Sequence, residues 1–304
     1  MHALCCILRM NVLLPFAIGQ LMALTLSMSS FGSSFLANVQ FNSPALQTVP
    51  VYFCLSFCLF KVKRLTHPWW AYLLLAASDF FANYCIVRAL SLTSMTSAQL
   101  LNAATVPFVV LLGLLMFRRI PTKYQMIGLI VAVSGLGCVV YADVAKRGFD
   151  QDDHWIGNCL SLTAAFLYAA CNCLEEKVLV NDNGSVWEML GMLGLWGTLL
   201  SVTQAFVIES PLTIPVNSVV LGYWSCFTIA MLTFYALLSH FLSRWDASLF
   251  NLSILTASVY SAIIESIAVN SFQLGYWVYG LGFVLTLAGC AMYHSSVVST
   301  SLPK

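Results

Sequence analysis

Acids and amides embedded in long apolar stretches are the residues of this sequence best suited to chemistry. Asp79 lies about halfway along the apolar stretch from Trp69 to Ala89, and Asn83 follows one helical turn later on the same face. A carboxylate at that depth in a membrane is costly against lipid, so it should face protein or a water-filled path. We therefore expect Asp79 to bind a solute or a proton, with a purely structural hydrogen bond as the alternative.

A second polar group occupies half of the uncharged stretch from Leu92 to Phe117. Gln99 and Asn102 lie one turn apart there, shortly before Pro107. The proline removes one backbone donor and frees the carbonyl of Ala103, so the helix can bend at that point. Such amides often join one helix to another. Their combination with a proline and an apolar second half favours a helix that lines a cavity.

The apolar stretch from Ala247 to Val269, the ninth along the chain, carries a third set of polar side chains. Asn251, Ser258 and Glu265 are spaced by seven residues. A helix drifts by only about 20° over seven residues, so all three share one face. We expect this face to contribute to the same site, with Glu265 as its carboxylate. The alternative is that Glu265 lies close enough to the outer interface to reach water.

These candidates need a membrane scaffold to position them. Hydrophobic residues make up 60% of the chain and charged residues 8%, whereas soluble proteins have about 25% charged residues. Apolar stretches recur along the whole length and predict an all-α membrane protein with ten transmembrane helices. The predicted helices are Asn11–Leu36, Pro44–Phe60, Trp69–Ala89, Thr93–Phe117, Thr122–Val140, Ile156–Leu174, Val186–Ile208, Val219–Leu242, Ala247–Val269 and Leu274–Tyr293.

Several functional classes are disfavoured by composition. The eleven cysteines include no CxxC pair and no zinc spacing, so we expect neither a metal site nor a disulfide framework. The five histidines lie at termini or interfaces without an HExxH motif or catalytic partners, so we expect neither an enzyme nor a cofactor. Charged residues lie in short connections rather than in a basic patch, which gives no indication of nucleic acid binding.

Lysine and arginine placement predicts the orientation. Short cytosolic loops retain positive charge. With the N-terminus inside, ten basic residues are cytosolic and only three face the other side. The cytosolic set is Arg9, Lys61, Lys63, Arg64, Arg118, Arg119, Lys123, Lys177, Arg244 and Lys304, and the other set is Arg88, Lys146 and Arg147. We expect both termini to be cytosolic, in either the plasma membrane or an endomembrane.

Two neighbouring acids end the sixth stretch on its predicted cytosolic side. Glu175 and Glu176 lie at the C-terminal end of a helix, where the helix dipole disfavours negative charge. We expect them to form a cytosolic gate by pairing with Lys177, Arg244 or Arg119. Two solvated carboxylates are the alternative.

An internal repeat indicates the architecture. The fifth and tenth stretches share five identities at a constant offset of 152 residues: Tyr124, Gly128, Gly137, Cys138 and Tyr141 match Tyr276, Gly280, Gly289, Cys290 and Tyr293. We expect one transmembrane domain over residues 1–304, with repeats of five helices at about 11–141 and 156–293. Because five is odd, the second repeat must enter the membrane from the opposite side, which is the inverted-repeat plan of many secondary transporters.

Several runs of residues resemble a known family. They are Gly19-Gln20, Asn42 to Gln47, Ala82-Asn83-Tyr84 to Val87, Leu92-Thr93, Thr96-Ser97 to Leu100-Leu101, Leu167-Tyr168 to Asn172 with Glu175-Glu176, and Asn251 to Tyr260. Over nearly the whole chain they are similar to the F subfamily of solute carrier family 35, in the drug/metabolite transporter superfamily. The resemblance implies ten helices in two inverted repeats, cytosolic termini and carrier-type movement of a small organic solute. The family usually has an acid at the positions of Phe81, Asn102 and Ser258, which this chain lacks.

Three functions therefore remain open on sequence alone. The first is a secondary-active carrier for a small neutral or cationic, aromatic solute, which by resemblance is nucleobase-like or nucleoside-like. The second is a nucleotide-sugar or nucleotide exchanger of the endomembrane system, which would need several cations in its cavity. Arg88 is the only arginine or lysine inside a predicted helix apart from Lys123, which lies at a helix end. The third is a non-transporting membrane scaffold, because acids of the family are lost. The partners are the lipid bilayer and the solute, and a homodimer is left open.

Overall fold

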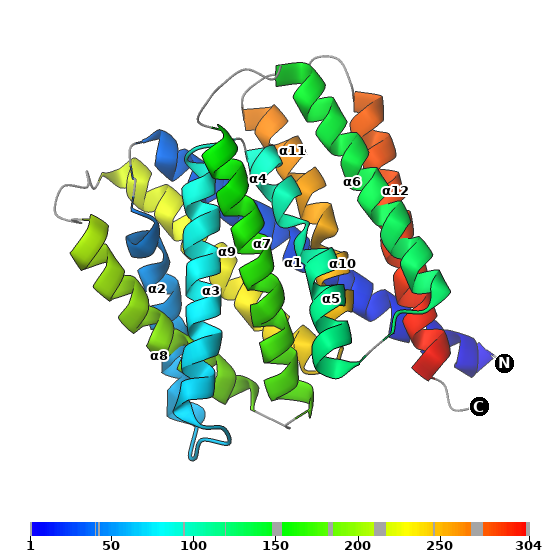
Figure 1. Ribbon diagram of the computed structural model, residues 1–304, viewed down its shortest axis with the longest axis horizontal. Helices are drawn as coiled ribbons and strands as arrows, with labels where there is room; N and C mark the ends of the chain where they lie inside the picture. Colours follow the sequence, from blue (N-terminus) through cyan, green and yellow to red (C-terminus); the bar gives the residue numbers. More distant parts are fainter. Residues whose placement is uncertain are drawn as a thin grey trace.

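Helices make up all the regular secondary structure that the computed structural model describes (Figure 1). The described residues are 2–39, 41, 43–93, 95–118, 120–147, 154–181, 185–209, 217–245, 247–268 and 276–301. In chain order the helices are α1 (His2–Asn38), α2 (Pro44–Ser56), α3 (Trp69–Leu90), α4 (Met95–Asn102), α5 (Thr105–Phe117), α6 (Lys123–Arg147), α7 (His154–Glu176), α8 (Val186–Gln204), α9 (Ser218–Leu242), α10 (Ala247–Ser253), α11 (Ala257–Ala268) and α12 (Tyr276–Ser301). Short turns η1 (Phe57–Lys61), η2 (Lys177–Asn181) and η3 (Ala205–Glu209) extend α2, α7 and α8, and η5 (Ile254–Thr256) joins α10 to α11.

Seven stretches of the described chain are long and apolar enough to cross a membrane. They are Leu14–Asn38, Pro44–Lys61, Trp69–Leu90, Trp155–Leu179, Val186–Glu209, Ser218–Leu242 and Ala247–Ile264. When α4 with α5, and α10 with η5 and α11, are each counted as one rod, the described residues form ten helical rods, as predicted. The predicted helix ends at Val269 and Leu274 lie outside the described residues.

The stretch predicted as a single helix from Thr93 to Phe117 is divided in two. α4 ends at Asn102 and α5 begins at Thr105. The Val106 N–H donates to the carbonyl oxygen of Ala103 at 3.1 Å. The Ala103 carbonyl freed by Pro107 therefore accepts a hydrogen bond from the chain itself, in a tight turn at the predicted bend.

The ninth rod is interrupted in a similar way. α10 and α11 are joined by the 3-10 turn η5, which changes the phase of the side chains on either side of it because a 3-10 turn has fewer residues per turn than an α-helix. Discontinuous helices at mid-membrane are a common way to build a binding site.

α2 packs closely along α8 because α8 presents a groove of small residues. Gly191, Gly194 and Gly197 follow one another at intervals of three along the face of α8 that meets α2 and η1. A Cβ atom at Gly197 would lie 2.5 Å from Cδ1 of Tyr52. Small residues permit this approach, and they hold the buried ring of Tyr52 against α8.

Two carboxylates of the α8 rod bind neighbouring elements. Glu209 accepts hydrogen bonds at the start of α2, from the Ser43 hydroxyl at 2.5 Å and the Ala45 N–H at 3.0 Å, which suits the N-terminus of a helix. Glu188 accepts from the Thr66 N–H at 2.6 Å, in the connection between α2 and α3, and from the Tyr72 hydroxyl of α3 at 2.6 Å. α2, α3 and α8 are thereby joined by charge-assisted hydrogen bonds.

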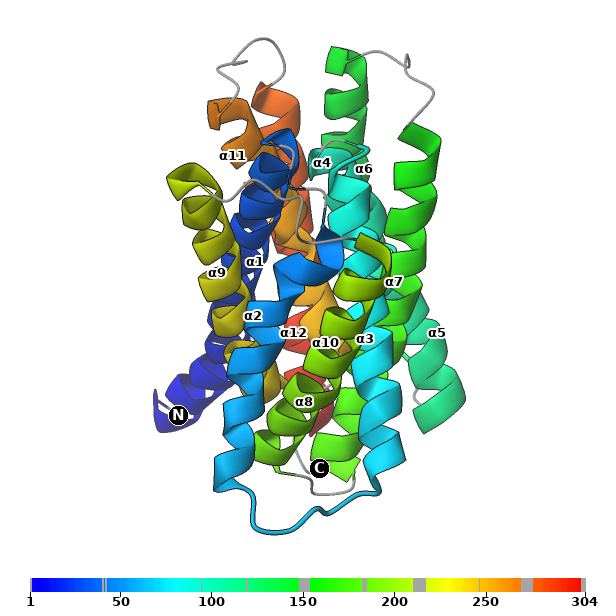
Figure 2. The ribbon, with the colours of Figure 1, turned by 90° about the vertical axis from the view of Figure 1, so that its left-hand side faces the viewer.

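α6 and α12 form an antiparallel pair at the edge of the molecule opposite α2 and α8 (Figure 1). Near the start of α6, Gly128 faces Gly289 in the middle of α12, and further along Gly135 faces Gly282. The first residues of α1 and the last of α12 lie toward the same end of the molecule, which is also the end of the connection between α2 and α3 (Figure 2).

Candidate functional site

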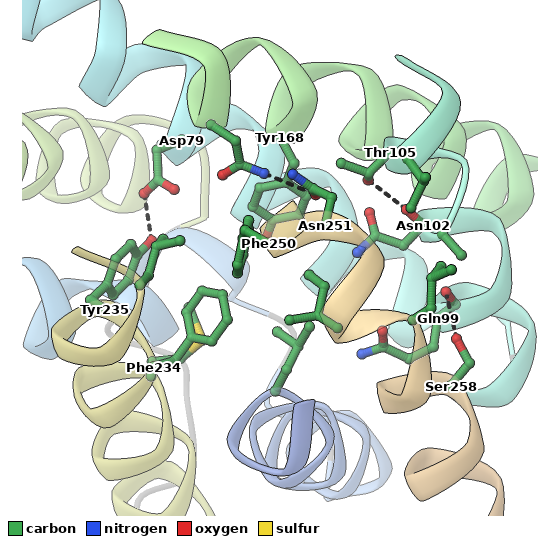
Figure 3. Close-up of a pocket in the computed structure, with 18 residues that line it drawn as sticks. Asp79, Gln99, Asn102, Thr105, Tyr168, Phe234, Tyr235, Phe250, Asn251 and Ser258 are labelled. Carbon is green, nitrogen blue, oxygen red and sulfur yellow. Dashed lines mark hydrogen bonds between the residues drawn. The ribbon is translucent and has the colours of Figure 1, made fainter. Parts of the chain in front are cut away.

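A cavity of about 50 Å³ lies between the two broken rods and the helices around them (Figure 3). Its polar and aromatic lining comes from both halves of the sequence. The lining residues used below are Asp79, Gln99, Asn102, Thr105, Tyr168, Asn172, Phe234, Tyr235, Phe250, Asn251 and Ser258. Five of the predicted site residues, namely Asp79, Gln99, Asn102, Asn251 and Ser258, therefore line one cavity.

Asp79 is held by donors from three helices. Its Oδ2 atom accepts hydrogen bonds from the hydroxyl groups of Tyr52 at 2.7 Å and Tyr235 at 2.5 Å, and from Nδ2 of Asn83 at 3.1 Å. The carboxylate is 4% exposed, so these donors replace the water that it would otherwise need. A carboxylate surrounded in this way can remain charged inside the protein.

Asn83 connects Asp79 to the other side of the cavity. Its Oδ1 atom accepts a hydrogen bond from the hydroxyl of Tyr168 at 2.8 Å. It lines a narrower space of about 20 Å³ next to the main cavity. The predicted shared face of Asp79 and Asn83 is seen, since Asn83 lies one turn after Asp79 and both reach the same cluster.

The break between α4 and α5 places two amides beside the cavity. Gln99 donates to the hydroxyl of Ser30, and its backbone carbonyl accepts from the Ser258 hydroxyl at 3.2 Å. The backbone carbonyl of Asn102 accepts from the Thr105 hydroxyl at 2.5 Å. The side-chain Oδ1 atom of Asn102, in contrast, is buried and has no hydrogen-bonding partner.

The remaining lining residues supply an amide pair and an aromatic wall. Asn172 donates to Oδ1 of Asn251 at 3.1 Å. Phe234 and Phe250 lie with ring centroids 6.1 Å apart, and Tyr168 and Tyr235 complete the aromatic lining (Figure 3). Tyr52, Tyr235 and Asn172 were not among the predicted site residues, although Tyr168 and Asn172 belong to a run that carries the family resemblance.

The acids predicted as a cytosolic gate have different surroundings. Glu176 accepts a hydrogen bond from the Ala247 N–H at 2.8 Å, at the start of α10. Glu175 is 0% exposed, and neither of its carboxyl oxygens has a hydrogen-bonding partner. The expected ion pair is therefore not found at Glu175, and neither acid is solvated. The Glu265 side chain lies outside the described residues.

The described lining of the cavity holds one acidic side chain, that of Asp79. No lysine, arginine or histidine is among its described lining residues. No group of three metal-ligating side chains occurs in the part of the chain that the structure describes. What the lining can do is accept and donate neutral hydrogen bonds, stack against a flat ring and attract positive charge.

A polar cavity inside an all-helical membrane bundle, bordered by two broken helices, is typical of a membrane transporter. A family model described as SLC35F, solute carrier family 35, matches residues 8–295. The chain belongs to this family and is a solute carrier rather than an enzyme.

Individual relatives agree with this family, and a solved structure shares the fold. Solute carrier family 35 member F2 of Mus musculus is 29% identical, over 96% of this chain and 81% of that protein. Member F2 of Xenopus tropicalis is 28% identical, over 97% of this chain and 80% of that protein. One crystal structure superposes with a TM-score of 0.70 at 18% identity, covering 92% of this chain and 97% of the other, which shows a shared fold.

Proposed function

We propose that this protein is a secondary-active carrier for a small, planar solute with N–H donors, of the nucleobase or nucleoside class, which it moves by alternating access. The observation that carries the proposal is the buried, unpartnered Oδ1 atom of Asn102 in a cavity lined with aromatic rings. A buried acceptor without a partner is costly, and a donor on the solute would satisfy it. Nitrogen heterocycles combine such donors with a flat face that stacks on Tyr168, Phe234 and Phe250.

The charge of the cavity favours this class over a nucleotide or nucleotide sugar. A pyrophosphate needs several cationic or backbone donors, whereas the described lining holds the Asp79 carboxylate and no basic side chain. An anionic solute would be repelled by Asp79, while a neutral or cationic one would be tolerated or attracted.

The contacts between helices support two inverted halves within one domain. α3 packs against α7. The counterparts of these two helices in the other half are α9 and α1, and they also pack against each other. α2 packs against its own counterpart α8, and α6 against α12. A twofold relation between the halves predicts this exchange of partners.

The offset of 152 residues supports the same relation at the site. Adding it to Ala103 and Ala104, in the first break, gives Leu255 and Thr256, in η5. Asn83 and Tyr235 are also 152 apart, and they are joined by a hydrogen bond of 2.9 Å. The two halves would thus contribute equivalent positions to the cavity.

A second hollow among the described residues supports a route from the central cavity to one side of the membrane. It has a volume of about 280 Å³ and lies between the ends of α5, α10 and α12, on the side of the chain ends. If that side is cytosolic, as the basic residues predict, cargo would exchange between this hollow and the central cavity as the halves rock.

Uptake by the purified protein in liposomes tests the proposal. We expect saturable uptake of labelled nucleobases, nucleosides or flat heterocyclic amines, and none of nucleotide sugars. Asn102→Leu has the same number of side-chain heavy atoms but no acceptor, and we expect it to lower uptake about tenfold or more, in line with the loss of one buried hydrogen bond.

Asn158→Leu is the matched control. Asn158 also has a buried Oδ1 atom without a partner, but it is not among the residues lining the described cavities. Uptake should be unchanged in this variant. Uptake confined to nucleotide sugars, or equal effects of the two substitutions, would contradict the proposal.

A further inference from the structure

Glu175 differs from the other acids whose side chains the structure describes. Asp79, Glu176, Glu188 and Glu209 each accept at least one hydrogen bond. Glu175 is fully buried, and both of its oxygens are without a partner. Such a group cannot be treated as an ordinary ionised carboxylate, because burying an unsolvated charge is far more costly than burying its neutral form.

Among the residues that the structure describes, the groups around Glu175 provide no compensating positive charge. Its own helix brings Cys171, one turn earlier, whose Sγ lies 4.0 Å from Oδ1 of Asp79. Because Glu175 follows Cys171 by one helical turn, about 5 Å along α7, it lies near Asp79 on α3, and a second negative charge is disfavoured at such a short separation inside the protein.

The other titratable residues nearby are engaged elsewhere or exposed. Tyr235 on α9 directs its hydroxyl to Asp79, and Tyr72 on α3 directs its hydroxyl to Glu188. Lys177 and His240 are exposed. α4, α5 and α10, which also pack against α7, contain no titratable residue.

We propose that Glu175 is a proton-binding residue of this protein and that it forms a coupled pair with Asp79. In the conformation described, Glu175 is a neutral carboxylic acid and Asp79 carries the single negative charge of the pair. The charge lies on Asp79 and the proton on Glu175 because their surroundings differ. Asp79 accepts from three hydrogen-bond donors, whereas Glu175 has none. Their protons are therefore bound and released as a pair.

The pair gives the proposed carrier a means of coupling to protons, and this step depends on the proposed function. A conformation that brings water or donors to Glu175 allows its O–H bond to break, leaving a carboxylate and transferring the proton to water on the side then open. Glu175 would be the residue that exchanges the proton, while Asp79 remains charged beside the solute.

Infrared spectroscopy tests the proton directly and needs no substrate. A protonated carboxylic acid has a C=O stretching band separate from that of carboxylates and amides. The purified protein at neutral pH should show this band, and Glu175→Gln should remove it. Glu176→Gln is the matched control, since the adjacent acid caps α10 as a carboxylate, and it should retain the band.

The pH dependence of unfolding provides a second readout. The folded protein holds a proton on Glu175 that the unfolded chain releases at neutral pH, so a rise in pH favours unfolding. For one proton the unfolding equilibrium constant should increase by about tenfold per pH unit relative to Glu175→Gln. Gln resembles the neutral acid in shape, so Glu175→Gln should fold.

The coupling to Asp79 predicts the effect of a third variant. In Asp79→Asn the neighbouring negative charge is gone, so the band of Glu175 should disappear at a lower pH than in the parent protein. An unchanged titration of the band would overturn the coupled pair.

Two results would overturn the assignment of the proton. One is a band that is absent from the parent protein or persists in Glu175→Gln. The other is a free energy of unfolding that depends on the sodium concentration while the band is missing. A bound cation would then compensate the charge of an ionised Glu175. A liposome that takes up none of the tested solutes would contradict the proposed function while leaving the infrared result intact.

Discussion

The polar groups on two walls of the central cavity differ in their hydrogen bonding. Where α2, α3 and α9 meet, Asp79 accepts three hydrogen bonds within one cluster. At the break between α4 and α5, the Oδ1 atom of Asn102 is buried without a partner. A satisfied buried network stabilises one arrangement of the helices, whereas an unsatisfied group costs folding free energy. The comparison indicates that the first wall stabilises the fold, whereas the second wall has an acceptor, Oδ1 of Asn102, that a ligand can use.

Removing the carboxylate from the satisfied wall should have the largest effect on stability. Asp79→Leu keeps the number of side-chain heavy atoms but leaves the hydroxyl donors of Tyr52 and Tyr235 buried without their acceptor. We expect the free energy of unfolding to fall by about 3–5 kcal/mol. Reversible unfolding in mixed micelles containing increasing SDS measures it.

Asp79→Asn is the control for that substitution. Its amide oxygen still accepts hydrogen bonds from the two tyrosine hydroxyl groups, so the loss should be clearly smaller than for Asp79→Leu. If both variants unfolded like the parent protein, the cluster would not support the fold and the contrast between the walls would disappear.

A smaller effect should follow from removing one donor of the same wall. Tyr52→Phe deletes a hydroxyl that donates to Asp79 at 2.7 Å and leaves the ring packed against Gly197. We expect a loss of about 1.5–3 kcal/mol, the usual range for a hydrogen bond to a charged group, measured by the same SDS titration.

Tyr124→Phe is a suitable comparison, since Tyr124 is 71% exposed and its substitution should change stability by less than about 0.5 kcal/mol. In a double-mutant cycle, Tyr52→Phe should cost less in Asp79→Asn than in the parent protein. Strict additivity would show that the two side chains are not energetically coupled.

Much of the scaffold could be predicted because its signals are local. Uncharged stretches of membrane length predict helices, and Asp79 with Asn83 shares a face by helical spacing alone. Pro107 indicates a bend near Ala103. The second break, η5, contains no proline, so no local rule reveals it. Only the offset of 152 residues relates it to the first break.

Partners from distant helices could not be predicted in the same way. Tyr52 and Tyr235 reach Asp79 from α2 and α9, and no spacing within α3 encodes these contacts. The gate prediction assumed that the helix ends beside Glu175 at an interface. In the structure, α7 runs to Glu176 and η2 continues it to Asn181. Glu175 therefore lies inside the protein, and its surroundings differ from those expected.

The smallest effect on stability is predicted for the unsatisfied wall. Asn102→Leu replaces a buried acceptor that has no hydrogen bond in the folded protein by an apolar side chain with the same number of heavy atoms. No partner is left unpaired at the Oδ1 position, so the desolvation penalty of the acceptor disappears and nothing is lost in exchange. The free energy of unfolding, measured in mixed SDS micelles, should be unchanged within about 0.5 kcal/mol or should increase.

Asn251→Leu is the matched control for this last prediction. Asn251 has the same side chain and also lines the cavity, but it accepts from Asn172 at 3.1 Å and donates to the carbonyl of Ala247 at 2.8 Å. Its replacement should therefore lower the free energy of unfolding by about 1–3 kcal/mol. A loss of stability in Asn102→Leu as large as in Asn251→Leu would mean that the Asn102 side chain is needed for folding. In that case an unsatisfied atom would no longer distinguish the wall that binds solute from the wall that supports the fold.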